Sequence, residues 1–157
     1  IEKLRKLTKK KNIVRATPLP PIEINKGPII LCPPNKSAKN IFKNLGLVIE
    51  IPNEKLSYKF WSTASIMASY YELLNVSSGW LIKKGINKKT ADNYISELFL
   101  SLSQDAVNKK SQGFKKLVAD SQTPKGLNMQ ALNELKRAKF YNKFINALES
   151  INKRVSN

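Results

Sequence analysis

The chain has 157 residues, 41% of them hydrophobic, and carries 28 Lys and Arg against 11 Asp and Glu, for a formal net charge of +17. This length and apolar content favour a folded globular protein over a disordered chain. The sequence has no His and one Cys, which excludes Ser-His-Asp and Cys-His nucleophile systems, His-containing zinc sites and an internal disulfide within these residues.

Residues 1–53 have the pattern of an α/β segment. Glu2 to Leu7 reads as the end of an amphipathic helix, and a short helix is expected from Ser37 to Asn44, before Gly46. Seven prolines between positions 18 and 52 exclude a long helix here. Short apolar runs predict three strands, at Ile13–Val14, Pro28–Leu31 and Leu47–Ile51. This portion looks like the closing section of a sheet that cannot cover both faces of its own strands.

Helices are expected from residue 54 onward, where Pro becomes rare. Glu54 to Lys84 is either one long helix or two in sequence, and its apolar residues fall on nearly every face. Gly85 ends this stretch and Asn87 caps the next helix, whose apolar face runs from Ala91 to Ala106. Because a helix that is apolar all round must be covered by other elements, we expect a second copy of the chain to pack on it.

A short turn near the end separates helix-patterned stretches. It follows a short helix expected at Phe114–Val118, and apolar stripes from Met129 to Leu135 and from Phe140 to Val155 come after it. Its sequence is Thr123-Pro124-Lys125-Gly126-Leu127-Asn128. A Thr-Pro step favours a helix start, and the unpaired N–H groups of a helix N-terminus attract a carboxylate or phosphate. The turn is therefore a candidate anion cradle, and an ordinary interhelix turn is the alternative.

The loop and its flanks resemble the end of the pyrroline-5-carboxylate reductases, where a Ser-Pro-Gly-Gly-Thr-Thr loop opens a helix. Thr123, Pro124 and Gly126 stand where the family has Ser, Pro and its second Gly. Residues 13–21 are similar to the family's strand ending in Arg-x-Met-Pro-Asn-Thr-Pro, and residues 27–32 and 46–52 resemble the last two strands of its nucleotide-binding domain.

This resemblance implies a fold class and a domain organisation. Residues 1–53 would be an α/β remnant of a Rossmann-like nucleotide-binding domain. Residues 54–157 would be an all-α helical dimerisation and substrate domain that forms a homodimer or a higher homo-oligomer. The family's first strand and Gly-rich, pyrophosphate-binding turn have no counterpart before Ile1. We therefore expect a fragment of a longer protein that is inactive by itself.

The family reduces the C=N bond of pyrroline-5-carboxylate to give proline, with hydride from NADPH or NADH. The resemblance implies that a small carboxylate substrate binds backbone N–H groups at Lys125, Gly126 and Leu127, with Thr123 in the same loop. The candidate catalytic donor to the ring nitrogen is Asn128, provided that the loop shifts by one residue. No metal site is expected.

Two further segments carry implied contacts and departures from the family pattern. Thr17 and Pro18 would contact the cofactor, but the following Leu19 and Pro20 replace polar residues of the family. Ser65 would contact the substrate within Thr63–Ala68, which replaces the family's Ser-Gly-Ser-Gly-Pro-Ala. Together with the missing donor at Leu127, these changes favour a different substrate or a dead site.

Three functions follow in order of preference. The first is a pyrroline-5-carboxylate reductase-like oxidoreductase of proline biosynthesis that uses NADP or NAD, and the second is a degenerate, non-catalytic dimerisation protein of the same fold. Nucleic-acid binding ranks third, because the positive charge is spread from Lys3 to Arg154 rather than gathered in one patch. No apolar run reaches the roughly 20 residues that span a bilayer, so we expect a cytoplasmic protein with no membrane partner.

Overall fold

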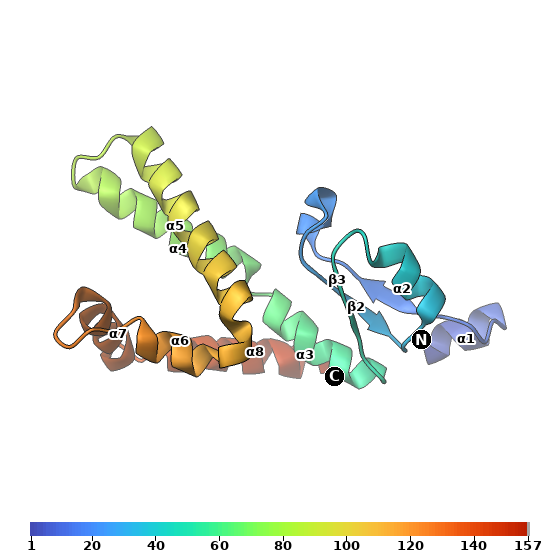
Figure 1. Ribbon diagram of the computed structural model, residues 1–157. Coiled ribbons are helices and arrows are strands. Elements are labelled where there is room, and N and C mark those ends of the chain that lie inside the picture. Colours follow the sequence, from blue (N-terminus) through green and yellow to red (C-terminus); the bar gives the residue numbers. More distant parts are fainter. Residues whose placement is uncertain (157) are drawn as a thin grey trace. The chain divides into compact units, whose positions relative to one another are not determined.

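The computed structural model describes residues 1–156. The chain divides into two compact units, the first made of Ile1–Ser65 with the chain end from Ala147, and the second of Ile66–Asn146. Figure 1 shows the sheet in the first unit and the helices of the second. This architecture confirms the expected fold class, a small α/β portion followed by a helical portion.

The first unit holds a three-stranded mixed sheet in the order β1-β2-β3. Strand β1 is antiparallel to β2, and β3 is parallel to β2. The elements are α1 (Glu2–Thr8), β1 (Arg15–Thr17), the 3-10 helix η1 (Pro20–Ile24), β2 (Pro28–Cys32), α2 (Lys36–Phe42), β3 (Leu47–Glu50) and α3 (Glu54–Ala64).

The core of this unit forms around β2, which α2 and α3 both contact. Four consecutive residues of β2, from Ile29 to Cys32, are buried, so both faces of the strand are covered. On one face Ile30 and Cys32 pack with Ile51 and with Leu56 of α3. The central strand thus anchors the sheet by apolar burial.

Two boundaries differ from those expected. Strand β1 begins at Arg15, not at Ile13–Val14, because Arg15 pairs with Cys32 and the next partner in the ladder is Pro33, which has no N–H to donate. The helix expected from Ser37 to Asn44 instead runs from Lys36 to Phe42. Its N-cap is Asn35, whose side chain accepts a hydrogen bond from the Ala38 N–H at 2.9 Å.

The second unit is helical. Its elements are α4 (Met67–Lys83), α5 (Lys88–Lys109), the 3-10 helix η2 (Lys110–Gln112), α6 (Phe114–Asp120), α7 (Leu127–Arg137) and the first part of α8 (Phe140–Ser156), whose last part belongs to the first unit. Helices α4 and α5 pack together as a hairpin (Figure 1). Asn87 caps α5 as expected, since its side chain accepts from the Thr90 N–H at 3.0 Å.

The stretch from Glu54 to Lys84 forms two helices, which decides between the two alternatives. Hydroxyl groups at the end of α3 compete for main-chain carbonyls there: Ser62 donates to the Tyr58 carbonyl at 2.7 Å, and Ser65 donates to the Ser62 carbonyl at 2.6 Å. Such back-bonding weakens and bends a helix. The break therefore forms here without Gly or Pro.

Helix α4 is apolar but little buried, as its composition predicts for a helix that needs a partner. The one buried residue of α4 is Ser78. Its large exposed apolar side chains are Tyr70, Tyr71, Leu73, Val76, Trp80 and Ile82. No helix within residues 1–156 is both long and apolar enough to cross a membrane.

Candidate functional site

The loop before α7 is a tight turn rather than the beginning of a helix. The Gly126 N–H donates to the Thr123 carbonyl at 2.8 Å, Pro124 occupies the second position and Lys125 has a φ of 61°. Proline followed by a positive φ is the pattern of a type II turn. The expected helix start at Thr123-Pro124 is therefore wrong, and α7 begins at Leu127 because no α-helix accommodates a positive φ at Lys125.

A side chain at the last position of this turn would collide with Thr123 as it is placed here. A Cβ on Gly126 would lie 2.1 Å from the Thr123 Oγ1 and 3.0 Å from its carbonyl oxygen. Gly126 is the N-cap of α7 and offers no side-chain cap. The first N–H groups of the helix, those of Leu127, Asn128 and Met129, have no carbonyl one turn before them.

The loop carries positive charge. Lys125 is exposed, and the nearest acidic residue before it in the chain, Asp120, is paired with Lys116 at 2.6 Å. Between Thr123 and Asn128 the sequence has no acidic residue. Lys125 and the amino end of α7 therefore both favour an anion over a cation.

Asn128 uses its side chain within the loop. Its Nδ2 donates to the Ser121 carbonyl at 2.9 Å, which ties the first turn of α7 to the end of α6. Leu127, in contrast, is 82% exposed and has no polar side-chain atom. Main-chain N–H groups and Lys125 are available to bind a carboxylate. The side-chain amide of Asn128 instead donates its hydrogen bond to the Ser121 carbonyl.

The other predicted site residues lie in the first unit. Thr17 ends β1, where it pairs with Ile30, and is half-buried, while Pro18 is exposed. Ser65 is exposed and follows α3, and its hydroxyl donates to the Ser62 carbonyl. The loop from Thr123 to Asn128 belongs to the second unit.

A dinucleotide cofactor is implied by the resemblance, and Thr17 and Pro18 do not fit it by themselves. One hydroxyl and a proline form no cradle for a pyrophosphate, which needs several main-chain N–H groups. The buried side-chain atoms left without a hydrogen bond in residues 1–156 are Arg5 Nε, Ser57 Oγ and Trp61 Nε1. None of these atoms belongs to the segment from Thr17 to Pro21.

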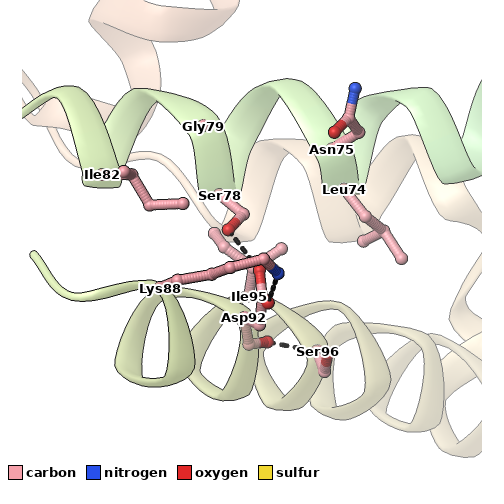
Figure 2. Close-up of a pocket in the computed structure, with 9 residues that line it drawn as sticks. All are labelled: Leu74, Asn75, Ser78, Gly79, Ile82, Lys88, Asp92, Ile95 and Ser96. Atoms are coloured by element: carbon pink, nitrogen blue, oxygen red, sulfur yellow. Dashed lines mark hydrogen bonds and ion pairs between the residues drawn. The ribbon is translucent and has the colours of Figure 1, made fainter.

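A polar cluster between α4 and α5 was missed at the sequence level. It lines a cleft of about 230 Å³, and Figure 2 shows Ser78 and Asp92 pointing toward one another with Lys88 alongside. Ser78 donates to Asp92 at 2.6 Å, and Lys88 forms an ion pair with the same carboxylate. The spacing of Lys88 and Asp92, four residues apart, was the one signal in the sequence.

The pKa of Asp92 reflects these contacts. The hydrogen bond from Lys88, followed by that from Ser78, lowers the pKa of the carboxyl group. A lowered pKa makes Asp92 a weaker base. The hydrogen bond from Ser78 to Asp92 joins α4 to α5, so the cluster is an interhelical clamp.

Neither the single cysteine nor the acidic residues within residues 1–156 form a reactive thiol site or a metal site. Cys32 is buried as expected, and burial raises the pKa of its thiol, which keeps it protonated and unreactive. Within residues 1–156 no three His, Cys, Asp or Glu side chains gather as metal ligands would.

Comparison with solved structures shows the fold. The Plasmodium falciparum pyrroline carboxylate reductase with NADP bound superposes with a TM-score of 0.82 at 22% identity, over 99% of this chain and 62% of that one. The Coxiella burnetii pyrroline-5-carboxylate reductase gives 0.82 at 24% identity, over 96% and 59%. The Streptococcus pyogenes 1-pyrroline-5-carboxylate reductase gives 0.78 at 18% identity, over 91% and 57%.

The chain therefore spans less than two thirds of the length of each of these structures, 62%, 59% and 57%. A search of curated proteins found no match. The family model described as pyrroline-5-carboxylate reductase dimerisation matches residues 60–157, which is more than half of the chain. The chain belongs to the pyrroline-5-carboxylate reductase family.

Proposed function

We propose that the complete protein is a pyrroline-5-carboxylate reductase-like oxidoreductase that uses NADPH or NADH to reduce a small carboxylated cyclic imine. The observation that carries this proposal is the turn before α7, in which a Cβ at Gly126 would collide with Thr123 and an uncapped helix N-terminus follows. This turn lies inside the segment that matches the family model.

In this proposal the loop binds the substrate carboxylate. The N–H groups at the start of α7 donate to the carboxylate, and each charge at a helix N-terminus is stabilised by roughly 0.3–1 kcal/mol, or more where water is excluded. Thr123 shapes the turn that directs these groups, and Lys125 adds a positive charge. The chain thereby holds and orients an anion at one defined place.

The remaining site assignments belong to the same proposal. Ser65 would contact the substrate, and Thr17 and Pro18 would lie beside the nicotinamide cofactor without holding its pyrophosphate. That cofactor would supply the hydride for reduction of the C=N bond. The cofactor preference follows the Plasmodium relative, which was solved with NADP bound. Residues 1–53 and 54–157 act as nucleotide-side and substrate-side domains. One buried cysteine fits a reducing compartment such as the cytoplasm.

We also propose that the helical portion associates with a second copy to form a homodimer. Large apolar side chains are exposed along α4, among them Tyr71 at 57% and Trp80 at 59%. An apolar surface of this extent marks an interaction site. The family model that covers this portion is named for dimerisation.

The test measures oxidation of NADPH by the complete protein supplied with pyrroline-5-carboxylate. We expect turnover by the natural protein and a raised KM in Gly126→Ala, because the added Cβ meets the Thr123 Oγ1. Gly79→Ala is the matched control, since a Cβ there meets nothing within 4 Å. Absence of turnover by the natural protein would falsify the activity.

A non-catalytic dimerisation protein is the second candidate. It is favoured by Leu127, which has no donor, and by the amide of Asn128, which bonds the Ser121 carbonyl. Sedimentation of a stable dimer, together with no binding of NADPH by the complete protein, would support this candidate. Tight NADPH binding would exclude it.

A further inference from the structure

The side chain of Arg15 joins strand β1 to helix α3. Its Nη1 lies 2.5 Å from the Oε1 of Glu54, the first residue of α3, and its guanidinium carbon lies 5.4 Å from the centre of the Trp61 ring. The side chains of the ion pair are 34% and 26% exposed, so both are partly withdrawn from water. Arg15 therefore contacts the first turn of α3 by charge and its last turn by stacking on an indole.

The face of α3 that meets Arg15 is closely covered. Glu54, Ser57 and Trp61 lie on this face because they are three and four residues apart. The small Ser57 side chain, which lies between the two larger ones, is 1% exposed. The Oε2 of Glu54 also accepts from the Ile1 nitrogen at 2.7 Å, which holds the carboxylate from a second side. Side chains locked by their neighbours in this way keep the groups that they contact in a fixed geometry.

The two elements that Arg15 joins both lead to residues of the proposed site. Thr17 and Pro18, which the proposed function places beside the cofactor, follow Arg15 at the end of β1. Ser65, which the same proposal places at the substrate, donates its N–H to the Trp61 carbonyl at 3.1 Å. All these residues belong to the first unit. The contacts of Arg15 therefore set the separation between the end of the strand and the end of the helix.

We propose that Arg15 is a positioning residue for the reduction, which acts through Trp61 and holds the end of β1 at a fixed separation from the end of α3. The inference rests on the proposed function and adds a residue that contacts neither substrate nor cofactor. Reacting atoms must be held about 3–3.5 Å apart, and a displacement of about 1 Å can slow a reaction by roughly 10²-fold. Loss of Arg15 therefore lowers the rate of reduction more than the affinity for either ligand.

The experiment measures single turnovers of the complete protein with pyrroline-5-carboxylate. When the protein is in excess over NADPH and the imine is saturating, the rate constant of NADPH oxidation describes each folded complex and does not depend on the folded fraction. Arg15→Gln removes both contacts, whereas Arg15→Lys keeps a charge for Glu54 and lacks the planar guanidinium. NMR of the buried Trp61 indole N–H, with Trp80 as the reference, reports the stacking without any ligand.

The matched control is Lys39→Gln. The ion pair between Lys39 and Glu50, at 2.8 Å, also joins a helix to a strand of the first unit, but these are α2 and β3. The control therefore removes a similar charge and a similar contact without touching the connection between β1 and α3.

We expect Arg15→Gln to lower the single-turnover rate constant by about tenfold or more. The KM for the imine and the Kd of NADPH should change by less than about threefold, as for a group that acts only on the reaction step. Arg15→Lys should lower the rate constant by about two- to fivefold, and it provides the test if the glutamine variant does not fold. The Trp61 indole resonance should shift in both variants, and Lys39→Gln should change none of these quantities.

An unchanged rate constant in both Arg15 variants overturns the inference and leaves the proposed activity standing. A raised KM at an unchanged rate constant also overturns it, because that result identifies a role in binding. A Trp61 resonance that stays in place shows that Arg15 does not stack on this ring in solution, which overturns it as well. Absence of turnover by the natural protein contradicts the proposed function and removes the inference with it.

Discussion

The two units of this chain bury their side chains in opposite ways. In the first, β2 places four consecutive aliphatic and cysteine side chains in the interior, with Ile29 and Leu31 at 0% exposure. In the second, three residues are buried, Ser78, Ala91 and Ile95, although its helices carry more large apolar side chains. The sheet unit therefore completes a core of its own, while the helical unit leaves apolar surface for another molecule to cover.

The largest expected effect tests whether β2 is the centre of the core in the first unit, and it is expected at Leu31. Leu31→Ala removes a fully buried side chain from β2, and we expect it to lower the free energy of unfolding by about 2–5 kcal/mol. The measurement is denaturant unfolding followed by circular dichroism. Leu7→Ala, at a leucine that is 72% exposed in the same unit, should change the free energy by less than about 0.5 kcal/mol. Equal effects of the two variants would show that β2 is not the centre of the core.

Substitution of an exposed apolar residue in the helical unit should weaken association of two copies rather than lower the stability of the fold. Trp80→Ser removes a large exposed ring from α4, and we expect the dimer dissociation constant to rise by about tenfold or more, because buried Trp residues dominate interfaces. Analytical ultracentrifugation over a range of concentrations measures the effect, with circular dichroism as a check of helix content. Leu7→Ser is the control for an exposed apolar residue in the sheet unit. A natural protein that is monomeric at every concentration would break the comparison.

A polar clamp holds the α4–α5 hairpin, which makes part of the stability depend on pH. Asp92 has a lowered pKa because Lys88, and then Ser78, hydrogen-bond its carboxylate. Its contribution is complete above the unfolded pKa of about 3.9 and is lost as the pH falls through the lower folded value. The thermal unfolding midpoints of the natural protein and of Asp92→Asn should therefore differ at pH 7 and become equal in strong acid. A difference that stays constant down to pH 2 contradicts the clamp.

Helices and strands are predicted well from the sequence where nearby side chains determine their boundaries. The cap at Asn87, the short helix at Phe114 and strand β2 follow from side chains that act within a few residues. Strand β1 could not be located this way, because its start depends on Pro33, which follows the partner strand β2. That information lies in the pairing register, which is set only when the sheet forms.

The interhelix turn before α7 was predicted from the sequence, but its conformation was not. The motif predicts that Thr123, Lys125, Gly126 and Asn128 lie close together, and the structure places the first three in one turn and Asn128 in the first turn of α7. Pro124 predicted a helix start because proline suits the first helical turn. Lys125 prevents this by taking a positive φ in a turn that the hydrogen bond from the Gly126 N–H to the Thr123 carbonyl closes.

The smallest expected effect tests whether this turn is strained. Lys125 has a φ of 61°, which costs a residue with a Cβ roughly 1–2 kcal/mol. Lys125→Gly relieves that cost, but glycine also adds about 0.5–1 kcal/mol of unfolded-state entropy. The net change in the free energy of unfolding should be a stabilisation below about 1 kcal/mol, measured by denaturant unfolding. Lys136→Gly, in α7 where φ is helical, should destabilise by about 1 kcal/mol instead. The two lysine variants therefore shift stability in opposite directions if the turn before α7 has a left-handed residue in solution, and in the same direction if it does not.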